Sequence, residues 1–332
     1  MILEVDDLRI HYATQGGTVR AVDGASFAVP EGKIVGLVGE SGCGKTTAVR
    51  AIMGVLSENG RRAGGRIAFK GRVVDEAATK QLLWRDIAYV PQSAMNSLDP
   101  VYTVGRQIAE VLTKRGGRSA AAAKARAIEL FDLVGLSDRR LGDYPHQFSG
   151  GMRQRAAIAM ALALEPSLLL ADEPVTALDV IVQRQVLDTL RDLQQRLRLS
   201  MVMVTHDISV VAYLCDEVVV MYAGQVVESG PVREVLARPR HPYTMGLRNA
   251  FPDLLSDALE LVPIYGGPPD LGATLDGCRF APRCPFAQDS CRAGTAALAD
   301  AAAESHRSAC RRDNEADQLR AAAMDPATWQ HS

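Results

Sequence analysis

Four short apolar runs along the chain have the character of strands in a buried sheet. They are IVGLV at 34–38, IAYV at 87–90, LLLA at 168–171 and MVMVT at 201–205. Continuous apolar runs of this length are typical of strands that helices cover on both faces. The first twelve residues instead alternate apolar and polar positions, as a half-exposed strand does. The pattern predicts an α/β fold.

Between the second and third runs the hydrophobic period changes. Residues 93–164 contain TVGRQIAEVL and SAAAAKARAIELFDLVGL, whose apolar positions recur at helical spacing. We therefore expect a first domain over residues 1–235, with a sheet-and-helix core that this helical insert interrupts. We expect residues 236–332, which carry four of the six cysteines, to form a small C-terminal extension.

Composition places the chain among ordinary globular proteins. Its 332 residues carry 37 Lys and Arg against 39 Asp and Glu, a net charge of −2. This balance provides no bulk basic surface, so we expect no nucleic-acid partner. No apolar run approaches the roughly 20 residues of a membrane helix, and the N-terminus does not look like a signal peptide. We therefore expect a cytosolic protein.

The segment GESGCGKTT at 39–47, here called the phosphate loop, joins an apolar run to the helical stretch AVRAIMGVL. Its glycines allow several backbone N–H groups to approach phosphate oxygens, and the helix N-terminus favours an anion. Lys45 would place its charge between the β- and γ-phosphates, and the Thr46 hydroxyl would ligate Mg²⁺. A plain glycine-rich turn is the alternative, which the strand and helix flanks disfavour. The loop residues expected to bind nucleotide are Gly39, Ser41, Gly42, Gly44, Lys45, Thr46 and Thr47.

Polar side chains follow the other apolar runs. Asp172 and Glu173 come directly after LLLA, and ligands of open α/β sheets collect at the carboxyl ends of strands. We predict that Asp172 ligates Mg²⁺ and that Glu173 is the general base for the attacking water. Gln92 and His206 follow two further strands, and Asp179 would cap the N-terminus of the next helix. All five should lie at the same edge of the sheet as the phosphate loop.

A second glycine-rich helix start lies about a hundred residues after the phosphate loop. The segment FSGGMRQR at 148–155 leads into the alanine-rich AAIAMALALEP. Ser149, Gly150 and Gly151 leave N–H groups accessible at the helix start, which makes a second anion site. A simple serine cap with flexible glycines is the alternative. Two phosphate-type sites in one chain suggest that each meets nucleotide in a different subunit.

In this order, GESGCGKTT, Gln92, FSGGM, LLLADEP, ALD and His206 resemble the motifs of the nucleotide-binding subunit of ABC transporters over roughly residues 1–235. The resemblance implies a P-loop NTPase fold with a RecA-like core, an antiparallel β subdomain and a helical subdomain that carries the signature. Three positions depart from the common pattern, namely Phe148, Met152 and Val175. The Ser-Gly-Gly core is intact.

The same resemblance implies roles for individual residues. ATP would be held by the phosphate loop of one subunit and closed by Ser149, Gly150 and Gly151 of the other, in a head-to-tail dimer. Gln92 would contact Mg²⁺, His206 the γ-phosphate, and Tyr12 the adenine ring, although Tyr12 could be a plain strand aromatic. The helical insert would contact a separate transmembrane permease, which places the chain peripherally at the cytoplasmic face of the cell membrane.

The tail resembles one branch of this family. RHPYT at 240–244 and the cysteine segment resemble the C-terminal extension of the oligopeptide, dipeptide and nickel importer ATPases, and SENGRRAGGRIAFKG resembles the first, "D", of their two paired ATPases. This implies peptide import by two permeases, a second unlike F-type ATPase and an external binding protein. Nickel-chelate or sugar cargo and an identical partner subunit remain open.

Cys278, Cys284, Cys291 and Cys310 are candidate metal ligands. None of their spacings matches the close ligand pairs of structural zinc sites, whereas a 4Fe–4S cluster accepts irregular, loop-borne spacing. The family resemblance also implies iron–sulfur, and we expect the cluster to act as a structural staple. Zinc, and free or oxidised thiols, remain alternatives. Of the other cysteines, the one at position 43 is expected to be incidental and the one at 215 to fill the core.

Three rival functions share part of the pattern. A soluble ABC-type ATPase of repair or translation would usually add a second ATPase half, a coiled coil or a basic surface. A P-loop kinase has no reason to carry FSGGM followed by ALD and His206. A non-hydrolysing subunit is disfavoured because Lys45, Asp172, Glu173 and His206 are all present.

Overall fold

The structure, a computed structural model, describes residues 1–250, 263–273, 275–294, 296, 298–300 and 305–330. The chain divides into two compact units, each built from several segments. Unit 1 comprises residues 1–2, 29–34 and 75–204, and unit 2 comprises residues 3–28, 35–74 and 205–332.

Unit 1 combines parallel strands with helices. β7 pairs in parallel with β6, where Leu168 faces Ile87, and with β8, where Leu168 faces Ser200. All five residues of β7 are buried, as a continuous apolar run predicts. The elements are α2 (Glu76–Leu82), β6 (Ile87–Val90), η1 (Ala94–Asn96), α3 (Val104–Glu110), η2 (Val111–Arg115), α4 (Ala120–Leu133), η3 (Asp138–Gly142), η4 (Pro145–Gln147), α5 (Gly150–Ala161), β7 (Leu168–Asp172), α6 (Val180–Leu197) and β8 (Ser200–Thr205).

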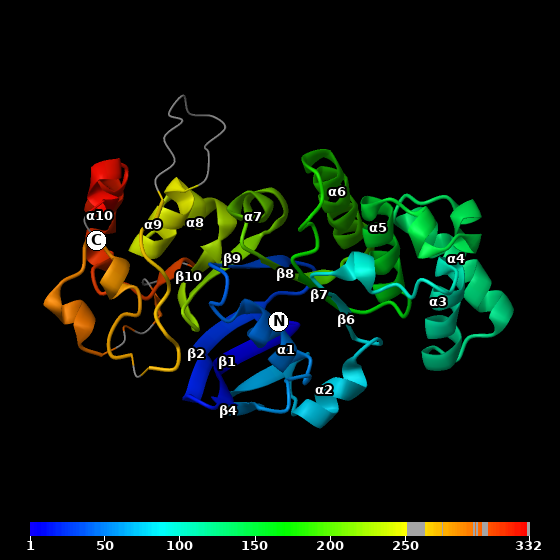
Figure 1. Ribbon diagram of the computed structural model, residues 1–332, viewed down its shortest axis with the longest axis horizontal. Helices are drawn as coiled ribbons and strands as arrows, with labels where there is room; N and C mark the ends of the chain where they lie inside the picture. The colour runs from blue at the N-terminus through cyan, green and yellow to red at the C-terminus, as the bar shows by residue number, and fades with distance from the viewer. Residues whose placement is uncertain (251–262, 274, 295, 297, 301–304, 331–332) are drawn as a thin grey trace. The chain divides into compact units, whose positions relative to one another are not determined.

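Helices dominate residues 93–164, as their sequence period predicts. α3, α4 and α5 pack against one another (Figure 1), and their contact buries Val104, Ile108 and Phe131. The periodicity did not predict the π-helical turn η2 directly after α3. This segment supplies the start of α5, where the Ser-Gly-Gly sequence lies.

Unit 2 contains two groups of strands. One is a four-stranded sheet in the order β2-β1-β4-β5, whose β1 and β4 are antiparallel. In the other, β3 runs parallel to β9, and β10 is antiparallel to both β9 and β12. The elements are β1 (Leu3–Thr14), β2 (Gly17–Val29), β3 (Ile34–Val38), α1 (Lys45–Ile52), β4 (Gly60–Phe69), β5 (Arg72–Val73), α7 (Ile208–Leu214), β9 (Glu217–Tyr222), β10 (Gln225–Pro231), α8 (Val232–Ala237), α9 (Pro242–Asn249), η5 (Ala281–Arg283), η6 (Asp289–Arg292), β11 (Ala299–Asp300), β12 (Arg307–Ser308), η7 (Asp313–Glu315), α10 (Ala316–Ala323) and η8 (Pro326–Trp329).

The C-terminal extension shares its hydrophobic core with the strands of unit 2. Phe280, Leu319 and Trp329 of the tail belong to the same buried cluster as Val38 of β3 and Val220 of β9. The sequence predicted a tail without a large core of its own, held by a metal. The structure instead shows a tail anchored by apolar burial against the sheet.

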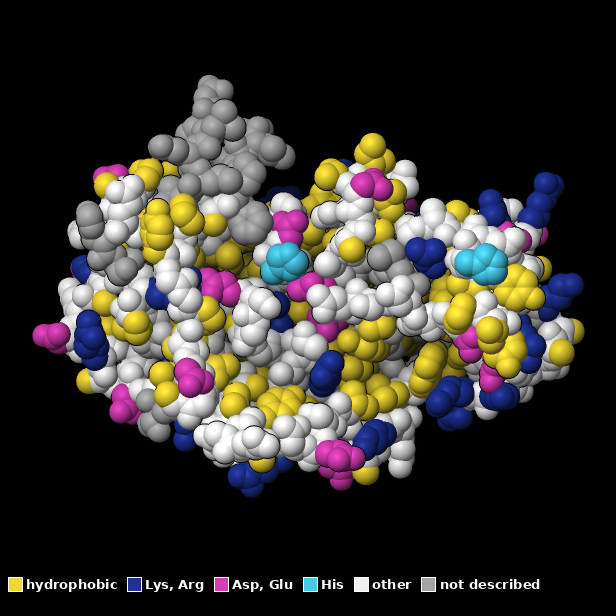
Figure 2. All heavy atoms as spheres, viewed as in Figure 1, with side chains coloured by type: hydrophobic (Ala, Val, Ile, Leu, Met, Phe, Trp, Pro, Cys, Tyr) yellow, Lys and Arg dark blue, Asp and Glu magenta, His cyan; other side chains and the backbone are white. Residues whose placement is uncertain are grey.

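The surface carries both signs of charge. Figure 2 shows basic and acidic side chains scattered over the face in view, in keeping with the net charge of −2. In the part of the chain that the structure describes, no helix has the length and apolar character needed to cross a bilayer.

Candidate ATPase site

Two glycines of the phosphate loop occupy positions that other residues would not tolerate. Gly44 caps α1 with φ +105°, and a Cβ there would lie 2.4 Å from the carbonyl oxygen of Ala21. Gly39 has φ +156°, and its Cβ would lie 2.1 Å from the carbonyl oxygen of Met221. The loop therefore passes close to neighbouring backbone, which only glycine permits.

Lys45 is held inside the phosphate loop. It is only 6% exposed, and its Nζ donates to the carbonyl oxygens of Gly39 at 2.6 Å and Glu40 at 2.9 Å. Thr46 and Thr47 follow in the first turn of α1. An ammonium group fixed by the loop's own carbonyls, beside a helix N-terminus, is placed to bond phosphate oxygens.

The two predicted acids lie at the end of β7 in unit 1. Asp172 is 1% exposed, and one of its carboxylate oxygens accepts a hydrogen bond from the Tyr89 hydroxyl at 3.3 Å. Glu173 adopts a left-handed backbone with φ +46°, and its N–H donates to Val204 of the neighbouring strand at 2.8 Å. A strained non-glycine residue at a strand end is a common feature of functional sites.

Glu173 and Gln92 meet, although 81 positions separate them in the sequence. Gln92 Nε2 donates to Glu173 Oε2 at 2.7 Å, and the Thr176 hydroxyl donates to the same oxygen at 3.0 Å. The sequence predicted Gln92 and Glu173 as site residues but not Thr176. The only indication in the sequence was that Thr176 lies three residues after Glu173. The contact gives the predicted base a fixed orientation.

Two helix caps in unit 1 involve predicted residues. Asp179 accepts a hydrogen bond from the N–H of Val182 at 2.9 Å, which confirms the expected cap of α6. Ser149 caps α5 by accepting from the N–H of Met152 at 3.3 Å. A Cβ on Gly151 would lie 2.3 Å from Val182 Cγ1, so this glycine is required where α5 approaches α6.

The predicted residues are divided between the two units. Unit 1 contains Gln92 and Glu173, which are in contact, the adjacent Asp172, and the capping residues Ser149 and Asp179. In unit 2, Tyr12 lies on β1 against Gly60, and the exposed His206 directly follows β8. Their contacts with nucleotide stay predictions.

The predicted iron–sulfur site is not supported by the structure. The described residues include all four cysteines, and among them no three His, Cys, Asp or Glu side chains are arranged to hold a metal ion. Burial raises the pKa of both Cys284 and Cys310 to about 12. Cys278 and Cys284 pack, with Phe286, against the buried cluster that contains Phe280.

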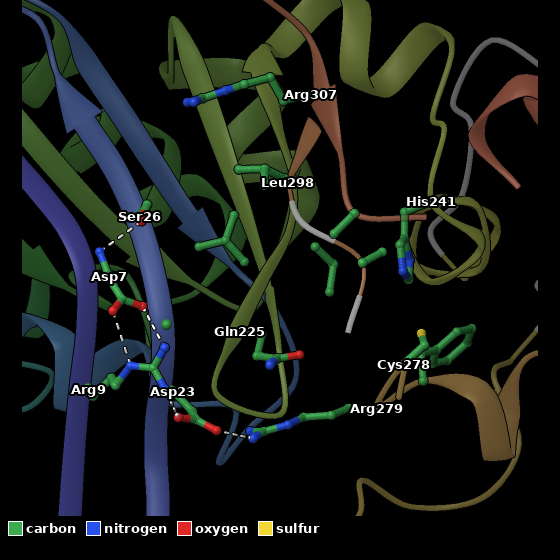
Figure 3. Close-up of a pocket in the computed structure, with 16 residues that line it drawn as sticks. Asp7, Arg9, Asp23, Ser26, Gln225, His241, Cys278, Arg279, Leu298 and Arg307 are labelled. Carbon is green, nitrogen blue, oxygen red and sulfur yellow. Dashed lines mark hydrogen bonds and ion pairs between the residues drawn. The ribbon is translucent and has the colours of Figure 1, made fainter. Parts of the chain in front are cut away.

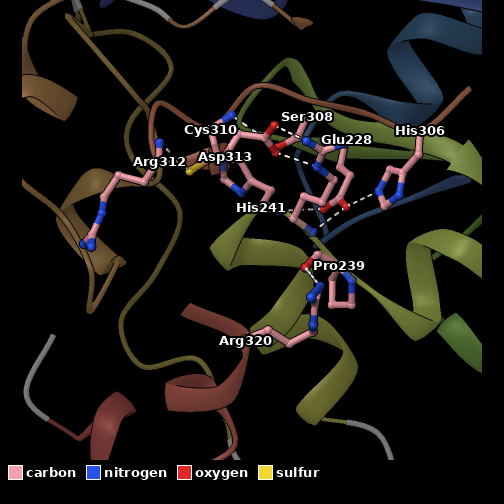
Figure 4. A network of polar contacts seen from close by, with 10 residues as sticks. Glu228, Pro239, His241, His306, Ser308, Cys310, Arg312, Asp313 and Arg320 are labelled. Carbon is pink, nitrogen blue, oxygen red and sulfur yellow. Dashed lines mark hydrogen bonds and ion pairs between the residues drawn. The ribbon is translucent and has the colours of Figure 1, made fainter. Parts of the chain in front are cut away.

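A buried carboxylate ties the RHPYT segment to β10 (Figure 4). Glu228 is fully buried, and it accepts hydrogen bonds from the N–H groups of Arg240 at 2.7 Å and His241 at 2.9 Å. His306 Nε2 lies 2.6 Å from the same carboxylate. These hydrogen bonds satisfy the buried Glu228 carboxylate, and the network therefore holds the start of α9 in one position.

Unit 2 contains a cavity of about 500 Å³, lined by residues of β1, β2, β10 and the tail. Figure 3 shows the lining side chains. Arg9 donates to Asp7 at 2.9 Å, and Asp23 pairs with both Arg9 and Arg279. The acids in its lining are therefore paired with arginines, and the Asp23–Arg279 pair joins the tail to β2.

Two family models match the chain. Residues 22–176 match the model described as ABC transporter, and residues 227–291 match the one described as oligopeptide/dipeptide transporter, C-terminal region. Among solved structures, the dimeric post-hydrolysis state of the ATP-binding cassette MJ0796 bound to ADP and Pi is similar, with TM-score 0.61 and 27% identity over 70% of this chain and 99% of that one.

Curated relatives match over most of their length. The oligopeptide transport ATP-binding protein OppD of Salmonella typhimurium is 45% identical over 296 residues, 88% of each chain. The dipeptide transport ATP-binding protein DppD of Escherichia coli is 43% identical over 302 residues, 90% of this chain and 92% of that one. A probable peptide ABC transporter ATP-binding protein of Sinorhizobium fredii is 45% identical over 95% of this chain and 96% of its own. This chain therefore belongs to the ATP-binding proteins of ABC transporters, in the oligopeptide/dipeptide group.

Proposed function

We propose that this chain is the subunit that hydrolyses ATP to power import of peptides through a separate permease. The observation that carries the proposal is the Gln92–Glu173 contact at the end of β7, in a chain that also holds Lys45 inside a phosphate loop. The relatives named for oligopeptide and dipeptide transport support peptide as the cargo.

The proposed roles follow the chemistry of each side chain. The phosphate loop binds the triphosphate, Lys45 neutralises charge on the γ-phosphate, and His206 contacts the γ-phosphate. Glu173 accepts the proton of the attacking water, and its contacts with Gln92 and Thr176 orient it. Thr46, Gln92 and Asp172 would hold Mg²⁺, which supplies Lewis-acid stabilisation of the phosphate oxygens when bound.

The proposed assembly is a head-to-tail ATPase dimer in which Ser149, Gly150 and Gly151 close on nucleotide held by the other subunit, with Asp179 nearby and Tyr12 on the adenine. The dimeric state of a similar cassette supports such pairing. An unlike F-type ATPase, two permeases and an external binding protein would complete the importer. The chain would lie at the cytoplasmic face of the membrane. We further propose the division into an ATPase domain over 1–235 and an extension over 236–332.

Replacing Glu173 by Gln tests the proposal. We expect hydrolysis of Mg·ATP by the full chain to fall by at least about 100-fold, because the amide cannot accept the proton, while ATP binding is retained. Asp188→Asn is a matched acid-to-amide control on α6, where Asp188 pairs with Arg184 at the surface. Near-normal hydrolysis by the Glu173→Gln chain would overturn the assignment of the base.

A further inference from the structure

The C-terminal extension contacts the phosphate loop through Glu40. The Glu40 N–H donates to the Tyr243 hydroxyl at 2.9 Å, and its carbonyl oxygen accepts from Lys45. The Glu40 carboxylate forms a two-pronged ion pair with Arg283, at 2.8 Å and 3.1 Å. Backbone and side chain of one loop residue are thus both held by residues more than 200 positions away.

Several contacts hold the Arg283 side chain in one position beside Glu40. Its side chain is 8% exposed, and it also donates to the carbonyl oxygen of Tyr265 at 2.9 Å and to the Tyr222 hydroxyl at 3.2 Å. Burial by itself lowers the pKa of Arg283, but the bonds to Glu40 and Tyr222 outweigh it and leave the pKa raised. The guanidinium is therefore a fixed positive charge in a pre-organised fork.

Tyr243 is equally constrained. It is fully buried on the first turn of α9, and its ring packs on Tyr222 at 4.7 Å and Phe280 at 5.4 Å between centroids. Its N–H donates to His241 Nδ1 at 3.1 Å, which fixes the start of the helix. The hydroxyl that receives the loop N–H therefore has little freedom to move.

We infer that Arg283 and Tyr243 are positioning residues for ATP binding, through which the C-terminal extension holds the phosphate loop in shape and neutralises Glu40. The inference deepens the proposed function and rests on it. A carboxylate left unpaired in the loop repels the triphosphate, and a loop released from Tyr243 no longer presents its N–H groups in one geometry. Residues of the C-terminal extension therefore increase the affinity of the phosphate loop for ATP.

The test compares the unmodified full chain with Arg283→Met, Glu40→Gln, the double variant of these two, and Tyr243→Phe. We expect Arg283→Met to weaken ATP binding and raise the KM of hydrolysis about tenfold, ~1.4 kcal/mol, with kcat within about twofold. In the double variant the charge is gone as well, and we expect the Kd for ATP to return to within about threefold of the unmodified chain. Tyr243→Phe should raise the Kd by a smaller factor.

Arg240→Met is the matched control. Arg240 forms a comparable ion pair with Asp313 within the tail, with Nε 2.7 Å from Oδ1. Figure 4 shows Asp313 among the polar groups around Glu228. We expect this variant to lower the thermal midpoint as Arg283→Met does but to leave the Kd for ATP unchanged.

Two results would overturn the inference. One is an unchanged Kd in Arg283→Met. The other is equal weakening in Arg283→Met, the double variant and Arg240→Met in step with lost stability, which would make the contact merely structural. If the unmodified chain neither binds nor hydrolyses ATP, the proposed function falls together with the inference. If the unmodified chain binds and hydrolyses ATP, and the Arg283→Met variant binds and hydrolyses it equally well, only the inference falls.

Discussion

Replacing Trp329 by Ala tests whether the tail is part of the core that supports the phosphate loop. Trp329 is fully buried, its indole N–H donates to the carbonyl oxygen of Ala323 at 2.9 Å, and its ring packs edge-on against Phe286. A Cβ on Gly246 would lie only 2.6 Å from the ring, so α9 packs directly on the indole. The substitution therefore leaves a large cavity between elements rather than a relaxed surface.

The expected loss of unfolding free energy is about 4 kcal/mol. Truncation of a buried Trp or Phe to Ala costs roughly 3–5 kcal/mol in well-packed cores. Because Trp329 shares a buried cluster with Val38 of β3 and Val220 of β9, the loss should appear in the transition that also releases the phosphate loop. A loss of this size is a large fraction of the stability of a typical domain.

The assay is urea unfolding followed in parallel by far-ultraviolet circular dichroism and by release of a fluorescent ATP analogue. Met324→Ala is the control, because Met324 lies just after α10 yet is 61% exposed, and its effect should stay within about 0.5 kcal/mol. The reasoning is refuted if Trp329→Ala produces a separate early transition of the tail and leaves the midpoint for analogue release unmoved.

Three further predictions concern single positions. Burial lowers the pKa of His241 to about 3, so neutral His241 stabilises the fold above its unfolded pKa near 6.5, and this stability is lost as pH falls toward 3, by about 1.4 kcal/mol per pH unit. Urea unfolding between pH 4.5 and 7 should therefore show a shallower dependence of the unfolding free energy on pH for His241→Asn than for the unmodified chain. Identical slopes would contradict this. Gly44→Ala should weaken ATP binding by at least about tenfold, since its Cβ would lie 2.4 Å from the carbonyl oxygen of Ala21; calorimetric titration giving an unaltered Kd would argue against it. Gly151→Ala should cost about 1–3 kcal/mol through its clash with Val182, and thermal unfolding should show partial recovery when Val182→Ala is added.

The local chemistry of the site could be predicted because each motif is continuous in the sequence. The apolar runs predicted β3, β6, β7 and β8, and the residues that follow them were identified from the strand ends. Spacing cannot reveal which side chains meet across the fold. The Gln92–Glu173 bond spans 81 positions and the Glu40–Arg283 pair spans 243, so both depend on packing that no local pattern encodes.

In the tail, by contrast, the sequence led to a prediction that the structure does not support. The spacing of four cysteines suggested a metal cage, because a compact tail needs some source of stability. That source is the burial of Phe280, Leu319 and Trp329 against β9 and its neighbours. Phe280, Leu319 and Trp329 lie on or beside the short helices η5, α10 and η8, and helices of so few residues are hard to recognise from a hydrophobic period.

Peptide uptake is the most direct test of the proposed function. Cells in which this chain carries Lys45→Ala are compared with cells that carry the unmodified chain at the same level, and accumulation of a radiolabelled dipeptide is measured. Lys45 is buried in the phosphate loop with two carbonyl partners, so its loss removes the charge that binds the triphosphate. We expect uptake to fall to background, whereas undiminished uptake in the Lys45→Ala cells would contradict a role for this chain in powering peptide import.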